Sequence, residues 1–286
     1  MGRGPAKWTE KLIKRRQLEG YGKGEGSAYR PWLEASDISS LGRTRRIHGL
    51  KTGRTHHVFS DIENGLLLIL EWCADVVDIR EQFPLDRAIT SELAVELGIA
   101  HPTYPGTHVP TVMTADFLVT RKRAGKKVLE AFNAKSVREA EDVRALEKLE
   151  LQRVYFARCG VRHHIVFDTD IPPTLVANID WVRAALPKPG EPLPQTGRLD
   201  EVATRLLAEL AHARHTSTLA GYCGDFDARH GVETGTALRA ARVLLHQRRL
   251  RTDMTAPGLA SQPLAAFRVD VADSPPLRSE GSEQPC

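Results

Sequence analysis

Two short apolar segments, joined by a basic turn, constrain the fold of this chain more than any other feature. Residues 112–119 and 128–135 each have the pattern of a β-strand. Residues 120–127 between them predict an exposed hairpin turn, because they include Arg121, Lys122, Arg123 and Gly125. Side chains alternate faces along a strand, so Asp116 is predicted to share a face with Thr114, opposite Ala115 and Phe117.

Polar side chains lie toward one end of each predicted strand. By the same alternation, Asn133 and Lys135 share a face of the second strand. A carboxylate from Asp116, an amide oxygen and an ammonium group can therefore meet at adjacent strand ends. This set suits a metal-dependent phosphodiesterase, in which an acid holds a divalent cation and a lysine lies beside the attacking water. The alternative is that these are ordinary exposed strand residues, since a D…NxK pattern is loose.

Size and composition describe a soluble globular protein. The 286 residues suffice for two domains, with 41% hydrophobic and 27% charged residues. No apolar run reaches the roughly 20 residues of a membrane span, and the basic, glycine-rich start is not a secretory signal. The four cysteines form no CxxC pair, which argues against a zinc site or disulfide framework and favours a cytoplasmic location. A net charge of +4 permits a polyanionic partner.

A second predicted hairpin, within residues 43–59, is dense in basic side chains. Such density suits contact with DNA phosphates, although a solvated basic hairpin is the competing interpretation. The adjacent His56 and His57 point to opposite faces and make a poor metal pair. The candidate DNA-binding residues of this hairpin and the strand that follows it are Arg45, Arg46, Arg54, His57 and Arg80.

The remaining pattern alternates helices and strands. Ser60 followed by Glu63 is a capping box, in which Glu63 would accept from the Ser60 amide, and this alone explains Glu63. Ser136 and Glu139 form a second capping box, predicted to open a long helix to about residue 159. The predicted order gives an α/β fold with a mixed sheet. Its other elements are strands at 76–83 and 163–168 and helices at 60–73, 86–97 and 172–182.

Changes in composition predict five segments along the chain. Helices at 199–213 and 235–249 followed by a hairpin at 250–269 favour a winged-helix module, with a plain helical adaptor as the alternative. Prolines and glycines mark the linker before them. The segments are a basic glycine-rich arm (1–30), either packed or disordered, a catalytic domain (31–184), a linker (185–198), a helical or winged-helix-like partner- or DNA-binding domain (199–271) and a disordered tail (272–286).

Several motifs together resemble a known family. They are KTGRTHH at 51–57, SDIE at 60–63, DIREQFPL at 78–85, TADFLV at 114–119 and LEKLEL at 146–151. In this order they resemble TnsA, the endonuclease subunit of heteromeric cut-and-paste transposases. The resemblance covers roughly residues 1–185 and is weaker beyond. It implies a restriction-endonuclease-like N-terminal domain.

The resemblance also implies the active site. By position, Glu63, Asp116 and Lys135 would be catalytic, with Glu63 and Asp116 holding Mg²⁺, for which Mn²⁺ substitutes. Asn133 stands where that family has glutamine and most nucleases of the fold have an acid, and an amide oxygen is a weaker, neutral ligand. The backbone carbonyl of Ala134 would supply a further ligand.

The implied reaction is hydrolysis at the 5′ ends of a transposon. The implied partners are double-stranded transposon-end DNA, a TnsB-like transposase and a TnsC-like ATPase regulator, in a bacterial cytoplasm and at the nucleoid when active. Two rival functions remain open. One is a free-standing restriction or repair nuclease. The other is a DNA-binding regulator with a decayed nuclease core. The presence of Asn133 is consistent with the regulator, whereas the presence of all three catalytic residues argues against it.

Overall fold

The computed structural model describes residues 8–37, 44–188, 190–191, 193–212 and 216–270. The chain divides into two compact units, Met1–Pro173 and Thr174–Cys286, each of which is described by itself. The division precedes the proline-rich stretch that the sequence marks as a linker. The predicted tail at 272–286 lies outside the described residues.

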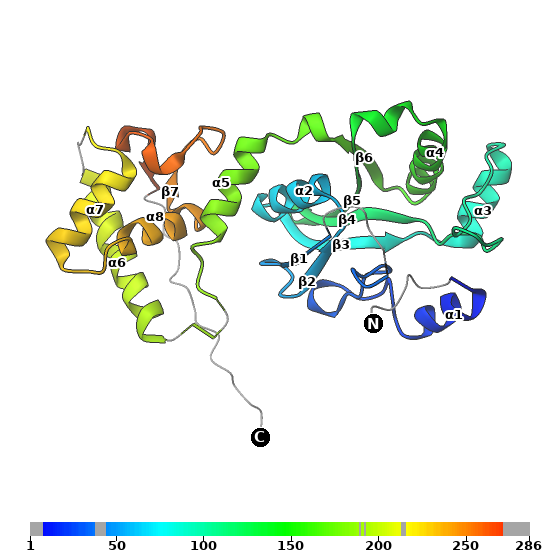
Figure 1. Ribbon diagram of the computed structural model, residues 1–286, viewed down its shortest axis with the longest axis horizontal. Coiled ribbons are helices and arrows are strands. Elements are labelled where there is room, and N and C mark those ends of the chain that lie inside the picture. Colours follow the sequence, from blue (N-terminus) through cyan, green and yellow to red (C-terminus); the bar gives the residue numbers. More distant parts are fainter. Residues whose placement is uncertain (1–7, 38–43, 189, 192, 213–215, 271–286) are drawn as a thin grey trace, which may run out of the picture. The chain divides into compact units, whose positions relative to one another are not determined.

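A four-stranded mixed sheet forms the centre of the first unit (Figure 1). Its order is β3 (Val76–Pro84), β4 (Thr114–Arg123), β5 (Lys126–Lys135) and β6 (Arg162–Phe167). The first three strands pair antiparallel, and β6 runs parallel to β5. The predicted α/β class with a mixed sheet is confirmed.

The β4–β5 hairpin is longer, and its turn shorter, than predicted. The turn consists of Ala124 and Gly125, both with positive φ (+47° and +77°), as tight hairpins of this twist require. Arg121, Lys122 and Arg123 therefore belong to β4 and not to the turn. These basic residues lie along a two-stranded ribbon.

Helices bury the sheet residues. The helix α3 (Arg87–Glu96) and α4 (Val143–Arg158) share one hydrophobic cluster with the sheet, whose members include Leu93, Leu118, Ala131, Leu151 and Phe156. This cluster joins Ala115 with Leu118, two residues that strict alternation would separate. The helix α2 (Asp61–Trp72) buries Leu66, Leu67 and Leu70 and contacts β2 (Thr55–Val58), β3 and β5.

The start of the chain is folded from Trp8 onward, as in the packed alternative for the basic glycine-rich segment. The helix α1 (Glu10–Leu18) is capped by Thr9, and η1 (Gly26–Ala28) follows it. Arg16 is buried, donates to the Trp32 carbonyl oxygen (2.6 Å) and pairs with Asp37. Aromatic packing explains why a basic segment folds here, since Ile13, Tyr21, Trp32, Tyr104 and Val112 form one buried cluster.

Two further predictions concern the elements around the sheet. The basic hairpin forms as predicted, from β1 (Arg45–His48) and β2 (Thr55–Val58). The Ser136 capping box is present but opens only η2 (Val137–Glu141), because Asp142 caps a new helix, α4. A short helix, η3 (Asp168–Asp170), follows β6.

The second unit is mainly helical. Its helices are α5 (Pro173–Arg183), α6 (Leu193–His212), α7 (Leu219–His230) and α8 (Thr236–His246), and α8 packs against α6 and α7. The predicted linker is partly helical, since α6 begins within it. The helix α7 is absent from the prediction because Gly221 and Gly224 lie inside it, and glycine disfavours helix interiors.

A short antiparallel pair, β7 (Leu250–Arg251) and β8 (Arg268–Val269), completes the second unit. The short helices η4 (Leu259–Ser261) and η5 (Leu264–Ala266) lie between these strands, where a simple hairpin was predicted. Within the described ranges no helix combines the length and the apolar character needed to cross a membrane.

Candidate active site

The start of α2 places Glu63 in a buried position, with 8% of its surface exposed. Ser60 caps the helix by accepting from the Glu63 amide (3.0 Å). The Glu63 carboxylate accepts in turn from the Ser60 hydroxyl (3.2 Å) and from the backbone amide of Phe59 (2.9 Å), not from the predicted Ser60 amide. The cap thus holds Glu63 in one orientation and leaves it buried beside the sheet.

The strand β4 supplies Asp116, which is 9% exposed. Its Oδ2 accepts from the backbone amide of Ala134 on β5 (2.7 Å). A hydrogen bond from the Asn133 side chain also reaches Asp116. The Asn133 Oδ1 accepts from His163 Nε2 (2.8 Å), and burial lowers the pKa of His163 to about 4, so that the ring is neutral at pH 7.

These contacts give Asn133 a different position from the one expected of a metal ligand. Its amide oxygen already has the His163 ring as partner, and its amide nitrogen serves Asp116. Ala134 contributes its backbone amide to the same carboxylate. In the arrangement seen here, both residues orient Asp116.

Glu63, Asp116 and Lys135 lie close enough to act on one another electrostatically. Burial and then the charge of Asp116 raise the pKa of Glu63 to about 8. Burial also raises the pKa of Asp116, although Lys135 and the Ala134 amide oppose the shift. Burial alone would lower the pKa of Lys135, but Asp116, Glu139 and Glu63 outweigh it and raise that pKa.

The resulting centre holds the buried carboxyl groups of Glu63 and Asp116, whose ionised forms are destabilised. The Lys135 ammonium group lies beside them. Lys135 is 27% exposed at its side chain and lies 3.8 Å from Glu139 Oε1. A divalent cation with oxygen preference would relieve the repulsion between the carboxylates. The described residues contain no group of three or more His, Cys, Asp or Glu side chains placed for a metal. Two carboxylates nevertheless fit Mg²⁺, which keeps several waters and takes phosphate oxygens as its remaining ligands.

Gln82 is a site neighbour that the sequence did not predict, and it contacts Thr114, which was predicted to share a face with Asp116. Gln82 is buried and has φ of +47°, a left-handed conformation that is uncommon outside glycine. Its amide nitrogen lies 3.5 Å from Glu63 Oε2, and its amide oxygen accepts from the Thr114 hydroxyl (3.1 Å). Gln82 thereby links α2 to the start of β4. The signal for it lay in the DIREQFPL motif, whose Gln82 interrupts an apolar strand.

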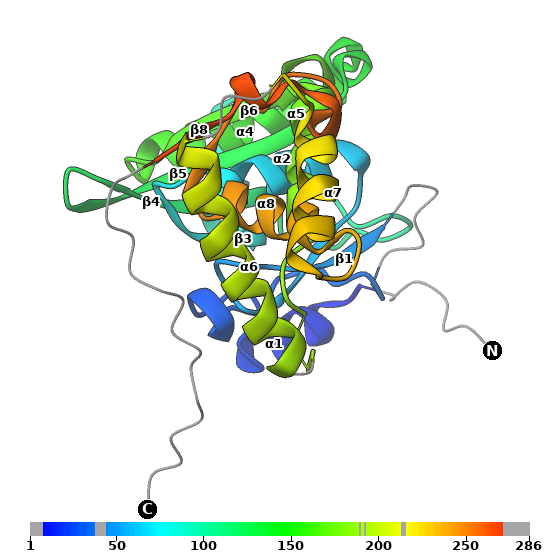
Figure 2. The same ribbon diagram turned by 90° about the vertical axis from the view of Figure 1, so that its left-hand side faces the viewer.

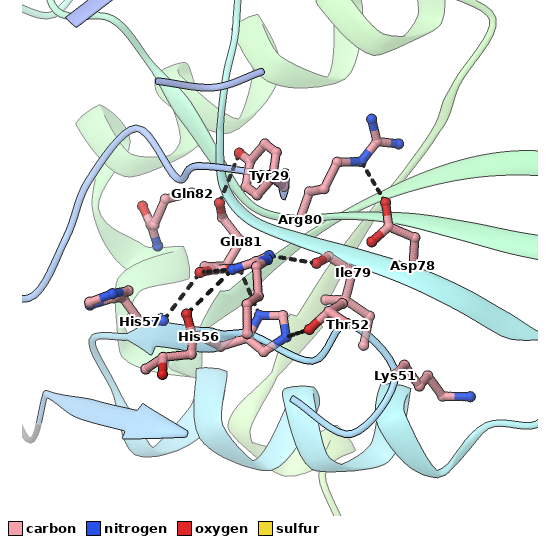
Figure 3. A network of polar contacts seen from close by, with 12 residues as sticks. Tyr29, Lys51, Thr52, His56, His57, Asp78, Ile79, Arg80, Glu81 and Gln82 are labelled. Atoms are coloured by element: carbon pink, nitrogen blue, oxygen red, sulfur yellow. Dashed lines mark hydrogen bonds and ion pairs between the residues drawn. The ribbon is translucent and has the colours of Figure 1, made fainter. Parts of the chain in front are cut away.

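A buried charge network surrounds the neighbouring residue, Glu81 (Figure 3). Glu81 is fully buried and accepts from Arg54 (2.5 and 2.7 Å), His56 Nδ1 (2.7 Å) and the His57 amide (3.2 Å). Thr52 contacts the other nitrogen of the His56 ring (2.9 Å). Burial would raise the pKa of Glu81, but the hydrogen bonds from His56 and Arg54 outweigh it and lower the pKa to about 2. The network fastens β2 to β3.

This network changes the interpretation of three candidate DNA-binding residues. Arg54 is committed to Glu81 and to the Ile79 carbonyl oxygen (2.8 Å). Arg80 is buried beside Asp78 (3.4 Å) and donates to Thr120 (3.2 Å). His57 Nδ1 accepts from the Ala35 amide (3.1 Å), and burial lowers its pKa, which disfavours a cationic ring. The side chains of these three residues are therefore engaged in contacts within the protein.

The other two candidates keep exposed side chains. Arg46 is exposed on β1, and Arg45 is exposed and pairs with Asp61 (2.7 Å). Of the five predicted DNA-binding residues, Arg45 and Arg46 are the two that are classed as exposed in the folded chain.

Comparisons with known proteins match both units. Residues 73–168 match the family model described as TnsA-like endonuclease N terminal, and residues 170–254 match that of TnsA endonuclease C terminal. The chain is 36% identical over 250 residues to the Transposon Tn7 transposition protein TnsA of Escherichia coli, covering 85% of this chain and 86% of that protein. Asp116 and Lys135 lie within the first match, and Glu63 precedes it.

Proposed function

Because the chain belongs to the TnsA family of transposition endonucleases, we propose that it hydrolyses phosphodiester bonds at the 5′ ends of a transposon, with Glu63, Asp116 and Lys135 as its catalytic residues. The single observation that carries this assignment is the convergence of the three side chains from α2, β4 and β5 on one buried centre. The pairing of β4 with β5 accounts for the proximity of Asp116 and Lys135, but it does not account for the burial of the Glu63 carboxylate beside them.

The Glu63 and Asp116 carboxylates would hold Mg²⁺, with Mn²⁺ as a substitute. When bound, the ion supplies positive charge that makes hydroxide accessible near neutral pH and offsets charge on the phosphate. Asp116 is held in its orientation by the Ala134 amide and Asn133. Glu63 is held in its orientation by Ser60 and Gln82. The Ala134 carbonyl oxygen would be a further ligand.

Lys135 would position the attacking water and stabilise the phosphate oxygens. The acids around it raise its pKa, so that it stays an ammonium group and serves as a donor, not as a base. Contributions of this electrostatic kind are worth about 3–4 kcal/mol of barrier for a single donor.

The two units would have different functions. The first unit would be the nuclease, and the second a helical, winged-helix-like module that contacts DNA or partners. A TnsB-like transposase that acts at the 3′ ends and a TnsC-like ATPase regulator are the partners we propose. Recognition of the transposon ends would come from them, since the sequence contains no motif for reading bases.

An end-cleavage assay tests the function. Asp116→Asn and Lys135→Met each keep the side-chain size and remove the charge. We expect each to lower Mg²⁺-dependent 5′ cleavage at transposon ends, in the presence of the cognate transposase, by at least ~100-fold. Glu150→Gln, an exposed change on α4, serves as the matched control and should cut normally.

The same assay separates the rivals. Cleavage of arbitrary duplex DNA by the chain alone would favour a free-standing nuclease. No cleavage by the parent chain with or without the transposase would favour a regulator. Normal cleavage by Asp116→Asn would refute the assigned site.

A further inference from the structure

The free end of the β4–β5 hairpin is a basic surface that the proposed function has not used. Beyond Arg121 on β4 and before Glu130 on β5, these strands pair with each other and with no other described strand. Residues 122–129 are all exposed. Figure 2 shows this end of the hairpin extending beyond the other strands of the sheet.

Acidic partners neutralise the two arginines at this end of the hairpin but not its lysines. Arg121 pairs with Asp75 (2.8 Å) and Glu130 (2.7 Å), and Arg123 pairs with the same two acids (3.6 and 2.9 Å). Three lysines remain, namely Lys122, Lys126 and Lys127, and this group is called the lysine tip below. Lys127 has only a distant, exposed partner, Glu25 (3.9 Å). Within the described part of the chain no acid pairs with Lys122 or Lys126.

The strand register makes this arrangement unfavourable for the protein alone. Lys122 lies directly opposite Lys127, and Arg123 lies directly opposite Lys126. Like charges at directly opposed positions destabilise an antiparallel pair. Acids of the chain offset Arg123, but they leave the three lysines at the end of this ribbon largely uncompensated. This indicates a surface that is neutralised by something outside the chain.

We propose that this lysine tip binds the phosphate backbone of the DNA duplex that the active site cuts. The proposal rests on the proposed function for the identity of the DNA. Its ligand is a polyanion, because the uncompensated side chains are all ammonium groups and phosphate contacts need no sequence-specific partner. A two-stranded ribbon is also narrow enough to lie against a groove.

The hairpin itself sets the distance between tip and active site. Lys135 and Lys126 lie at the two ends of β5, nine residues apart, or about 30 Å at roughly 3.3 Å per residue. At about 3.4 Å per base pair, this spans roughly nine base pairs of duplex. The tip would therefore contact phosphates up to about nine base pairs from the scissile bond, nearly one helical turn away.

Salt dependence of DNA binding tests the proposal. The full chain and the triple variant Lys122→Gln/Lys126→Gln/Lys127→Gln would be titrated with a 40-base-pair duplex in EDTA across a salt series. Each phosphate contact contributes about 0.9 to the slope of log affinity against log salt, so the variant should lose about 2.7 of that slope. A variant with equal charge removed elsewhere, Lys11→Gln/Lys14→Gln/Lys148→Gln, should retain the parent slope.

Thermal unfolding checks that the triple variant is folded. Because the substitutions remove opposed like charges, its midpoint should equal or exceed that of the parent. A reduced slope with an unchanged or higher midpoint supports the proposal. A slope unchanged in the tip variant overturns it, and would instead fit an acidic protein as partner. If the parent also cuts transposon ends normally, such a result leaves the proposed active site standing.

Discussion

At the scale of single residues, the sequence predicts the capping role of Glu63 but not the burial of its carboxylate. The Ser60–Glu63 spacing predicts a helix cap, and the cap forms. The family resemblance predicts a catalytic role for the same side chain, and burial beside Asp116 is the physical feature that spacing alone could not supply. The cap and the candidate site share one carboxylate, so neither interpretation excludes the other.

The raised pKa of Glu63 predicts a dependence of stability on pH. Folding raises this pKa from about 4.3 to about 8, so between these values the folded chain keeps a proton that the unfolded chain has released. In EDTA, the free energy of unfolding should therefore fall as pH rises from about 5 to 8, by an amount on the order of a few kcal/mol. Glu63→Gln should reduce this dependence, measured by urea unfolding at several pH values.

Addition of Mg²⁺ should oppose this loss of stability at higher pH. Metal ligands must be deprotonated, so the gain in unfolding midpoint on adding Mg²⁺ should be larger at pH 8 than at pH 6. Glu63→Gln should lose most of this gain, and Glu25→Gln, an exposed change, should keep it. An equal gain in the Glu63→Gln variant would contradict the role of Glu63 as a ligand.

At the scale of elements, periodicity predicted the positions of the strands well. It did not predict which charged residues would be buried in ion pairs. β3, β4, β5 and β6 occur close to their predicted places because each is an apolar run bounded by turn residues. Arg54 and Arg80 were predicted to bind DNA, yet Arg80 is buried and only 9% of the Arg54 side chain is exposed. Arg54 meets Glu81, a partner 27 residues away, and no local pattern reveals such a pairing.

Removal of the Glu81 charge should destabilise the first unit strongly. Glu81→Gln leaves Arg54 buried without its counter-charge, a change that costs about 3–5 kcal/mol. The control Glu150→Gln breaks an exposed ion pair with Arg153 and should cost under ~1 kcal/mol in urea unfolding. Similar costs for both changes would show that the network does not fasten β2 to β3.

The same network predicts acid sensitivity. Folding lowers the pKa of Glu81 to about 2, so its stabilising effect is present above about pH 4.3 and is lost as pH falls toward 2. Glu81→Gln should therefore lose much of the acid dependence that the parent shows below about pH 4. An unchanged acid dependence in the variant would show that Glu81 is not the group responsible for it.

At the scale of the whole molecule, the sequence indicates two parts but not their boundary. Prolines suggested a division near residues 185–198, whereas the contacts divide the chain at Pro173. The second unit has its own core, which includes Leu206, Phe226 and Leu244. Local composition did not reveal that α6 extends into the proline-rich segment, because the packing of its later residues sustains the helix.

Separate cores predict separate responses to a core substitution. Leu206→Ala removes a fully buried side chain and should cost about 2–5 kcal/mol within the second unit. Hydrogen exchange with mass spectrometry should show lost protection in peptides of α6, α7 and α8, with β3, β4 and β5 unchanged. An equal loss in both sets would mean that the chain unfolds as one cooperative body.

The most direct test of a metal centre built on Glu63 and Asp116 is the affinity of the full chain for Mn²⁺, measured by calorimetry near pH 7.5 for the parent, Glu63→Gln and Asp116→Asn. If both carboxylates hold one ion, each substitution should weaken binding by at least ~10-fold, while Glu25→Gln should bind as the parent does. Equal Mn²⁺ affinity in the parent and in both active-site variants would contradict a metal centre built on Glu63 and Asp116.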